Sequence, residues 1–480
     1  MNPALPSTLL SIANEIRSAG GESYLVGGWV RDYLMELPCG DFDVEVYGLE
    51  MERLLDLLKR FGKPNLVGKS FGVVTMNLDG HIYDFAFPRQ EQKTSVGHRG
   101  FSVNTDPHLD FATASSRRDF TVNAMGLRLP DLELLDCHGG RDDLKRKILR
   151  HISPAFSEDP LRALRAVQFA ARFGFDIHPG TQKLCAAQSL EELPPERIFG
   201  EFKKLLLQSA QPSIGFEWMR RMDMLRYFPE LETLIGVAQE PDWHPEGDVW
   251  THTMMVLDQA ARLRSEIEGE TEKLALMLGA LCHDLGKPTT TVYADGRWRS
   301  PAHDTRGEGP TRSFLARMTR ETDLVQTVVT YVREHLKPAL LHKAKHEIKP
   351  GAIRRLALRV NIGDLVRVAK ADHLGRTTEE SLDGLFPAGD WLLEQSQQLN
   401  VLEQRPKPFL TGQYLLSLGA QPGPGMGELI RESFELQLEG EIADVAAAEA
   451  WARKKLASIR PPVVERSRNT GGHSASDTPL

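Results

Sequence analysis

The sequence predicts an α/β domain at its N-terminal end, followed by a long all-α region. Residues 1 to about 150 alternate short β-favouring runs with helical patterns, and helical periodicity dominates from about residue 155 onwards. Alternating elements are typical of a sheet covered by helices, whereas a continuous helical pattern indicates packed helices. At 480 residues the chain is long enough to form several domains with large cores.

The most informative strand pattern carries two carboxylates, Asp41 and Asp43, in the run DFDVEV. Successive side chains of a strand point to opposite faces, so we expect both carboxylates on one face and Phe42 in the core. Oxygen ligands at this spacing suit a pair of Mg²⁺ ions, which can activate an attacking hydroxyl and neutralise a leaving pyrophosphate. A pair of solvated strand carboxylates is the alternative.

Two glycines, Gly27 and Gly28, follow the apolar run from Tyr24 to Val26 and open a helical pattern that ends near Met35. Because glycine has no side chain, it lets a triphosphate approach backbone N–H groups at the N-terminus of a helix. The alternative is an ordinary Gly-Gly turn.

Three motifs occur in order over about 160 residues, which makes a specific signal. They are Gly27-Gly28 with Arg31-Asp32 and Asp41-Phe42-Asp43, then Arg117-Arg118-Asp119-Phe120-Thr121-Val122-Asn123-Ala124, and finally Glu158-Asp159-Pro160-Leu161-Arg162. In these motifs the chain resembles the nucleotidyltransferase superfamily of DNA polymerase beta, in its class II branch. That branch contains the bacterial CCA-adding tRNA nucleotidyltransferases and the bacterial poly(A) polymerases. The resemblance implies that the incoming nucleotide is held by Gly27, Gly28, Arg31, Arg117, Arg118, Asp119 and Asn123.

The resemblance also implies that Asp159 and Arg162 form a template for the base. They lie three apart at the start of a helical run through Phe173, which puts them on one helix face. A carboxylate can accept from an exocyclic amino group while a guanidinium donates to the neighbouring ring nitrogen. Cytosine and adenine present that pair, and uracil and guanine present the reverse, so unpaired polar groups would penalise the wrong base. Alternatively, Asp159 simply caps the helix ahead of Pro160.

Two further residues, Asp84 and Arg89, occupy the next strand pattern and its exit. In the family a carboxylate near this position supports the metal pair, and an arginine starts a mobile loop. A plain strand-surface role is the alternative for Asp84. The segment 90–110 is rich in Gly, Ser, Thr and His and predicts a flexible loop, and residues 120–127 predict an apolar strand.

The helical half contains a His…His-Asp…Asp series formed by His252, His283, Asp284 and Asp372. His283-Asp284 ends an apolar helix, where a charged pair is costly unless a metal or another partner satisfies it. This order resembles the HD phosphohydrolase superfamily, whose metal ligands it matches. Related domains carry further histidines at the places of His303 and His335. Hydrogen-bonded core histidines are the alternative, and the ligands do not identify the divalent metal.

The closest subgroup by resemblance comprises CCA proteins with an HD domain. It implies accessory 2′,3′-cyclic phosphodiesterase, 2′-nucleotidase and phosphatase activities. The segment SPAHDTRGEGP departs from that subgroup, because His303 stands where a denser histidine cluster is usual. The departure argues against a second metal.

The charge balance argues against a protein coated in nucleic acid, because 58 basic and 66 acidic residues give 58 − 66 = −8. A local basic track, or else a solvated helix face, is formed by Arg141, Lys145, Arg146, Lys147 and Arg150. The four cysteines lack zinc-site spacing, and we find neither a signal sequence nor a long apolar run. We therefore expect a cytoplasmic protein without a membrane partner.

We predict a nucleotidyltransferase head at 1–150, a neck and body for base selection and tRNA binding at 151–240, an HD domain at 241–400, a helical tail at 401–460 and a disordered end at 461–480. The predicted reaction is CCA addition to the acceptor end of tRNA from CTP and ATP with Mg²⁺, by a monomer or a homodimer. The alternatives are a CC- or A-adding enzyme, a poly(A) polymerase, and an HD phosphohydrolase whose head senses nucleotides. A protein-modifying nucleotidyltransferase is disfavoured by its different head motif.

Overall fold

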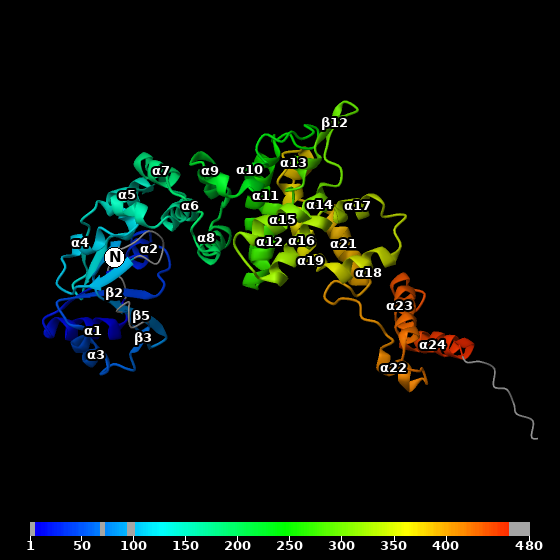
Figure 1. Cartoon of the computed structure of the whole chain (residues 1–480), viewed down its shortest axis with the longest axis horizontal. Coiled ribbons are helices and arrows are strands. Elements are labelled where there is room, and N and C mark those ends of the chain that lie inside the picture. The colour runs from blue at the N-terminus through cyan, green and yellow to red at the C-terminus, as the bar shows by residue number, and fades with distance from the viewer. Residues whose placement is uncertain (1–4, 68–72, 94–100, 460–480) are drawn as a thin grey trace, which may run out of the picture. The chain divides into compact units, whose positions relative to one another are not determined.

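The computed structural model describes residues 5–67, 73–93 and 101–459. The chain forms two compact units. The first contains residues 1–337 and 364–389, and the second contains residues 338–363 and 390–480. The first unit holds both the α/β head and a helical region, which confirms the predicted fold class (Figure 1).

The head is built on a mixed sheet with the strand order β3-β4-β5-β2-β1-β8-β9. β2 and β5 run parallel and the other neighbouring pairs are antiparallel. The strands are β1 Glu22–Val26, β2 Phe42–Tyr47, β3 Asn65–Val67, β4 Val73–Leu78, β5 His81–Ala86, β8 Gly126–Leu129 and β9 Glu133–Leu135. Helices α1 (Ser7–Ser18) and α3 (Met51–Leu58) contact each other, and α2 (Gly28–Leu34) follows β1 (Figure 1).

The predicted alternation in β2 is confirmed. Phe42, Val44 and Val46 are buried, whereas Asp41 and Asp43 are exposed. The ring of Phe42 stacks on that of Tyr83 in β5, with centroids 5.1 Å apart. The apolar face therefore fixes which side of the sheet presents the carboxylates.

Two predictions for the head are wrong. Instead of one loop across 90–110, β6 (Arg89–Lys93) pairs antiparallel with β7 (Phe101–Thr105), and residues 94–100 lie outside the described residues. The FSVNT run alternates β-favouring residues, which outweighs the turn-forming composition around it. The apolar strand predicted for 120–127 begins instead as the 3-10 turn Thr121–Asn123, because Thr121 Oγ1 donates to buried Asp143 at 2.8 Å.

The helical part of the first unit starts with α5 (Gly140–Arg146), α6 (Leu161–Phe173), α7 (Pro179–Ala186), α8 (Pro195–Gln208), α9 (Ser213–Arg221) and α10 (Pro229–Glu232). It continues with α11 (Val249–Leu263), α12 (Glu270–Cys282), α13 (Lys287–Thr290), α14 (His303–Arg306), α15 (Glu308–Ala316), α16 (Thr322–Glu334) and α20 (Glu379–Leu382), and includes most of α19 (Ile362–Leu374). A short hairpin of β12 (Val292–Ala294) and β13 (Arg297–Arg299) lies between α13 and α14. α12 is buried from Leu274 to Cys282 and packs on α11 and α16.

The second unit contains α18 (Pro350–Arg359), α22 (Gly412–Ser417), α23 (Pro424–Glu439) and α24 (Val445–Ile459). α17 (Lys337–Lys343) and α21 (Pro387–Gln398) begin in the first unit and continue in the second. Leu410, Leu415, Leu429 and Ile442 belong to its apolar core. The end predicted to be disordered, 461–480, lies outside the described residues. Within the described ranges, no helix is long and apolar enough to cross a membrane.

Candidate functional site

A polar cleft in the first unit collects most of the nucleotide-site residues predicted from the sequence. The cavity has a volume of about 640 Å³. Its lining includes the predicted residues Gly27, Gly28, Arg31, Asp43, Arg89, Arg117, Arg118, Asp119, Asn123, Asp159 and Arg162. These residues come from β2, α2, α6, the start of β6, the 3-10 turn Thr121–Asn123 and the segments next to these elements, so the fold brings together motifs that are far apart in the sequence.

Three carboxylates gather where β2 and β5 run side by side. Asp41 lies just before β2, and Asp43 is the register partner of Asp84 across the parallel pair. The pKa of Asp43 is raised, first by partial desolvation and then by the nearby Asp84 and Asp41 carboxylates, against the opposing effect of Arg118. A carboxylate crowded by other carboxylates favours a bound cation, so the donor set fits a divalent metal.

Glu45 is a further acidic residue of the same strand that was not predicted from the sequence. It lies two residues beyond Asp43, so the same alternation would have placed it on this face. Its carboxylate accepts from Arg118 Nη2 at 2.6 Å and from the Tyr47 hydroxyl at 2.8 Å. Glu45 therefore holds Arg118 beside Asp43.

Gly27 occupies a position that needs glycine. Its φ of 71° lies in the left-handed region, and a Cβ there would lie 3.0 Å from Arg118 Nη1 and 3.6 Å from Asp43 Oδ2. Gly28 then begins α2. The absence of a side chain keeps the space between the carboxylate and the guanidinium open.

Three of the predicted nucleotide-binding residues, Arg31, Asp119 and Asn123, are buried and bonded to one another. Arg31 Nη1 donates to Asn123 Oδ1 at 2.7 Å, and Asn123 Nδ2 donates to Asp119 Oδ1 at 3.0 Å. Arg165 Nη2 lies 2.7 Å from Asp119 Oδ2. Burial acts to raise the pKa of Asp119, but Arg165 and the hydrogen bonds from Asn123 and Phe120 outweigh it and hold that pKa low. This network fixes the wall of the cleft.

One face of α6 supplies a largely basic lining that was not predicted from the sequence. Arg165, Phe169 and Arg172 follow Arg162 at helical spacing, and this spacing was the signal that could have found them. Arg197 and Lys204 of α8 add to the same lining. The basic run near α5 is not among the residues that line the cleft: Arg150 pairs with Asp143 at 2.9 Å, and Arg141, Lys145, Arg146 and Lys147 are exposed.

The proposed base-reading pair lies at the start of α6. Asp159 Oδ1 accepts from the Leu161 N–H at 3.1 Å, so this carboxylate bonds to the first residue of α6, although Pro160 and not Asp159 occupies the N-cap position. Its other oxygen accepts from Arg197 Nη2 at 2.8 Å. Arg162 donates to the carbonyls of Ala155 at 2.9 Å and Arg117 at 2.7 Å. Both side chains are thus held in fixed orientations at the cleft.

The HD residues also come together. His252 Nε2 lies 3.1 Å from Asp372 Oδ1 and 3.9 Å from Asp284 Oδ2. His283 Nε2 lies 3.2 Å from Asp284 Oδ2 and has no hydrogen-bond partner in the described part of the chain. The four side chains are buried, and an orphaned buried nitrogen beside carboxylates fits a metal site.

Three histidines of the HD site already use Nδ1 in a hydrogen bond. Nδ1 of His283, His303 and His335 donates to a backbone carbonyl, those of Ala280, Ser300 and Val332, at 2.8, 2.8 and 2.6 Å. This bond leaves Nε2 of each ring available as a ligand. Ligand atoms of His303 and His335 lie within 4.8 Å of one another and of Asp284. The structure therefore forms a second group of possible metal ligands, although the segment SPAHDTRGEGP contains His303 alone.

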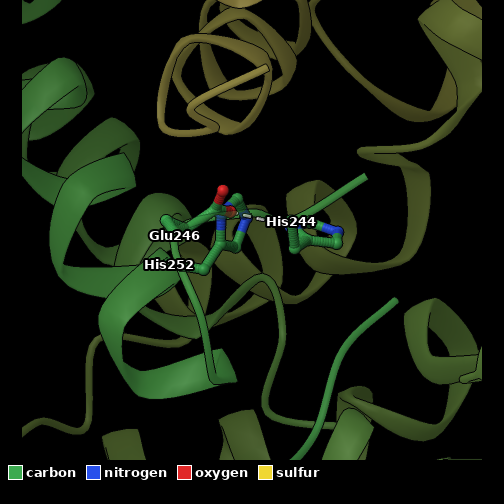
Figure 2. A group of neighbouring side chains, drawn as sticks. All are labelled: His244, Glu246 and His252. Atoms are coloured by element: carbon green, nitrogen blue, oxygen red, sulfur yellow. Dashed lines mark hydrogen bonds and ion pairs between the residues drawn. The ribbon is translucent and has the colours of Figure 1, made fainter. Parts of the chain in front are cut away.

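Glu246 and His244 were not predicted from the sequence. Together they orient His252, one of the four proposed metal ligands (Figure 2). Glu246 Oε1 accepts from His244 Nδ1 at 2.9 Å and from His252 Nδ1 at 2.8 Å. Burial acts to raise the pKa of Glu246, but these hydrogen bonds outweigh it and lower that pKa. Burial lowers the pKa of His244 to about 4. The run WHPEGDVWTH held the signal, a carboxylate between two histidines.

A parallel strand pair that presents carboxylates beside an arginine-lined cleft is the architecture of a nucleotidyltransferase head, here joined to an HD-type site. Family models agree: the Poly A polymerase head domain matches residues 23–150, the "Probable RNA and SrmB- binding site of polymerase A" matches 174–235, and the HD domain matches 249–376. Both kinds of domain generally use divalent metals.

Curated relatives define the family more closely. A multifunctional CCA protein of Xylella fastidiosa (strain 9a5c) is 38% identical over 383 residues, covering 77% of this chain and 88% of the relative. That of Laribacter hongkongensis is 38% identical over 371 residues, covering 75% and 86%. The chain belongs to the multifunctional CCA protein family.

Solved structures agree in fold. The Bacillus stearothermophilus CCA-adding enzyme in complex with CTP has a TM-score of 0.62 and 20% identity, covering 95% of this chain and 99% of that one. The Thermotoga maritima CCA-adding enzyme complexed with tRNA-CCA has a TM-score of 0.57 and 20% identity, covering 95% and 96%. The described part of the chain therefore shares its fold with the CCA-adding enzymes.

Proposed function

We propose that this protein adds CCA to the 3′ end of tRNA from CTP and ATP without a nucleic-acid template. The observation that carries the proposal is the position of Asp43 in a cleft that also contains Arg117, Arg118, Asp159 and Arg162. Carboxylates for a metal, cations for a triphosphate and a donor–acceptor pair for a base are the three parts that such a transfer needs.

Asp41 and Asp43, supported by Asp84, are the residues that would hold Mg²⁺. When bound there, Mg²⁺ lowers the pKa of the terminal ribose hydroxyl of tRNA and neutralises pyrophosphate. Arg117 and Arg118 bind the triphosphate and orient its α-phosphorus for in-line attack by that hydroxyl. Pyrophosphate then leaves toward the same arginines. Arg89 belongs to this lining as well, and Arg31, Asp119 and Asn123 keep the wall rigid.

Base choice belongs to Asp159 and Arg162. The Asp159 oxygen now bonded to Arg197 accepts from the exocyclic amino group, and Arg162 donates to the ring nitrogen. Both contacts suit cytosine and adenine. In uracil and guanine, the Asp159 carboxylate would face an acceptor and the Arg162 guanidinium would face a donor. An unmet buried hydrogen bond can give discrimination of about 10⁴-fold.

The HD site supports a second activity, hydrolysis of phosphate esters at RNA ends, including 2′,3′-cyclic phosphates and 2′-phosphates. His252, His283, Asp284 and Asp372 are the residues that would hold a divalent metal. His303 and His335 share Asp284 with that group and would hold a second metal or a phosphate. Such hydrolysis would leave the free hydroxyls that the head needs.

The test is extension of tRNAs that end before C74, C75 or A76, with CTP and ATP, followed by sequencing of the products. Complete CCA ends support the proposal. Products that stop at CC or gain only A indicate a partial enzyme, and long A tails indicate a poly(A) polymerase. Binding of CTP with no change in tRNA length indicates a nucleotide sensor. Because tRNA and nucleotides are cytoplasmic, we also propose a cytoplasmic location.

A further inference from the structure

We propose that Trp243 and Trp298 form a base-binding subsite of the HD site. The substrate class is then a nucleotide, free or at an RNA 3′ end, that carries a 2′-phosphate or a 2′,3′-cyclic phosphate. This inference rests on the phosphoester hydrolysis proposed for the HD site and adds how the substrate is recognised.

The two tryptophans line the same cavity as the metal-site residues. The cavity has a volume of about 210 Å³, and its lining includes Trp243 and Trp298 together with Asp284, His303, Lys287 and Arg376. The proposed ligands and two cations thus share one hollow with two indole rings. A phosphate would bind near the ligands and the cations, and a flat base would stack on the indole rings.

The rings are exposed, although large apolar side chains are normally buried in a folded core. Trp243 is 55% exposed and Trp298 is 38% exposed, and Tyr293 beside Trp298 is 62% exposed. Scattered exposed aromatics are ordinary on a protein surface, but two of them in one polar cavity are not scattered. Their exposed faces are available for stacking, and every base has such a face.

The hairpin that carries Trp298 is built to hold it in place. Asp295 and Gly296 have φ values of 52° and 74°, as a two-residue type I′ turn requires. The ring of Tyr293 lies edge-on to that of Trp298, with centroids 5.1 Å apart. Glu240 Oε2 accepts from the backbone N–H of Trp298 at 2.9 Å, which ties β13 to the segment that contains Trp243.

The hairpin is also joined to the metal ligands. The carbonyl of Ser300, just after β13, accepts from His303 Nδ1 at 2.8 Å. Thr291 and Ser300, on either side of the hairpin, bond through their hydroxyls at 2.8 Å. Trp298 is therefore held at a fixed distance from the proposed ligand His303. A nucleotide needs this, because its base and its phosphate also lie at a fixed distance from each other.

The cations of the cavity complete the match to a nucleotide. Lys287 Nζ lies 2.7 Å from Asp284 Oδ2, and Arg376 Nη2 lies 3.3 Å from Asp372 Oδ1. Each cation therefore contacts a carboxylate of the ligand set. Because Lys287 and Arg376 line the cavity beside these carboxylates, their positive charges would favour a phosphate ester there.

The test compares two secondary-alcohol phosphomonoesters, 2′-AMP with a base and glycerol 2-phosphate without one. The full-length protein loaded with divalent metal is assayed for phosphate release. The ratio of kcat/KM for 2′-AMP to that for glycerol 2-phosphate should fall about tenfold in Trp243→Leu or Trp298→Leu, since stacking on one ring is lost. Val292→Ala, an exposed residue of the same hairpin, is the matched control and should keep the ratio.

If the ratio of the two kcat/KM values is unchanged in both tryptophan variants, the proposed subsite is wrong. The same holds if kcat/KM falls equally for both esters, which would mean that the hairpin has only a structural role. Calorimetric binding to the metal-free protein gives a second readout. Wild type should bind 2′-AMP more tightly than glycerol 2-phosphate, and the tryptophan variants should lose this preference. If wild type hydrolyses neither ester, the hydrolase proposal fails, while the binding preference still decides the subsite.

Discussion

Asp43 of β2 and Asp84 of β5 are register partners across the parallel strand pair of the head sheet. Thr75 Oγ1 of the next strand donates to Asp84 Oδ1 at 2.5 Å, which fixes the orientation of that carboxylate. With Asp41 at the start of β2, the sheet presents three acids at one place. The proposed Mg²⁺ site therefore rests on the core of the sheet, since the apolar partners Phe42 and Tyr83 set the register.

Replacing Asp84 with Asn should weaken Mg²⁺ binding without removing the site. We expect CCA addition to fall about tenfold or more at low Mg²⁺, and high Mg²⁺ to restore part of it, because one ligand charge is lost. The measurement is the initial rate of tRNA extension across a Mg²⁺ titration. Glu133→Gln, on the edge strand β9, is the control. A rate that Mg²⁺ does not change would point to a structural role for Asp84.

Asp159→Asn separates base reading from helix capping. The remaining carbonyl oxygen can still accept from Leu161, so the thermal midpoint should change little, whereas Asp159→Ala should also lose the cap, at a cost of about 1 kcal/mol. The preference for CTP and ATP over UTP and GTP should fall at least about tenfold in both variants. Misincorporation is measured by sequencing extended tRNAs. Wild-type selectivity in Asp159→Asn would refute the template role.

Glu246→Gln tests the orientation of the HD ligands. Glutamine removes the negative charge that both histidines face, and its NH₂ group replaces the Oε2 that accepts from the Thr377 N–H at 3.1 Å, so metal affinity should fall about 10- to 100-fold. Competition with a chelator, followed by metal analysis, measures this affinity, and CCA addition by the head should persist. Glu268→Gln, at an exposed carboxylate, serves as the control. Equal metal affinity in wild type and Glu246→Gln would contradict the role that the structure gives to Glu246.

Asp119→Asn should destabilise the fold in a pH-dependent way. The folded pKa of Asp119 is lowered, so its charged form stabilises the protein above the unfolded pKa of about 4, and this is lost as the pH falls through the folded pKa. Removing the charge takes away the nearest carboxylate of Arg165 and leaves only Glu201 Oε1, 4.0 Å from Arg165 Nη1, so it should cost about 3 kcal/mol near pH 7.

Urea unfolding of wild type and Asp119→Asn between pH 7 and pH 3 measures this difference. The difference between the urea midpoints of wild type and Asp119→Asn should become smaller only below about pH 4. The exposed Asp142→Asn should change the free energy of unfolding by less than about 0.5 kcal/mol. A gap that stays constant with pH would mean that the Asp119 charge does not stabilise the fold.

The sequence was sufficient for features with a strong local signal. The alternation around Phe42 placed Asp41 and Asp43 correctly, and the ends of α6 and α12 follow from their apolar patterns and caps. The motifs also predicted which residues would meet in the cleft, although these residues come from distant elements.

The missed features depend on tertiary partners. Glu45 is one more acid on a strand until Arg118 lies 2.6 Å away, and Glu246 is one of many glutamates until two histidines donate to it. The pairing of β6 with β7 depends on long-range hydrogen bonds that outweigh a loop-like composition. Local pattern alone cannot supply these contacts.

The proposed metal site of the head is tested by extension of a tRNA that lacks its CCA end, using the Asp41→Asn and Asp43→Asn variants with CTP, ATP and Mg²⁺. Both side chains are exposed, so circular dichroism and thermal midpoints should match wild type. Nucleotide addition should fall by at least about 1,000-fold in each variant, because the proposed metal ligands are lost. Extension at the wild-type rate by either folded variant would show that its carboxylate is not needed to hold the metal for nucleotide addition.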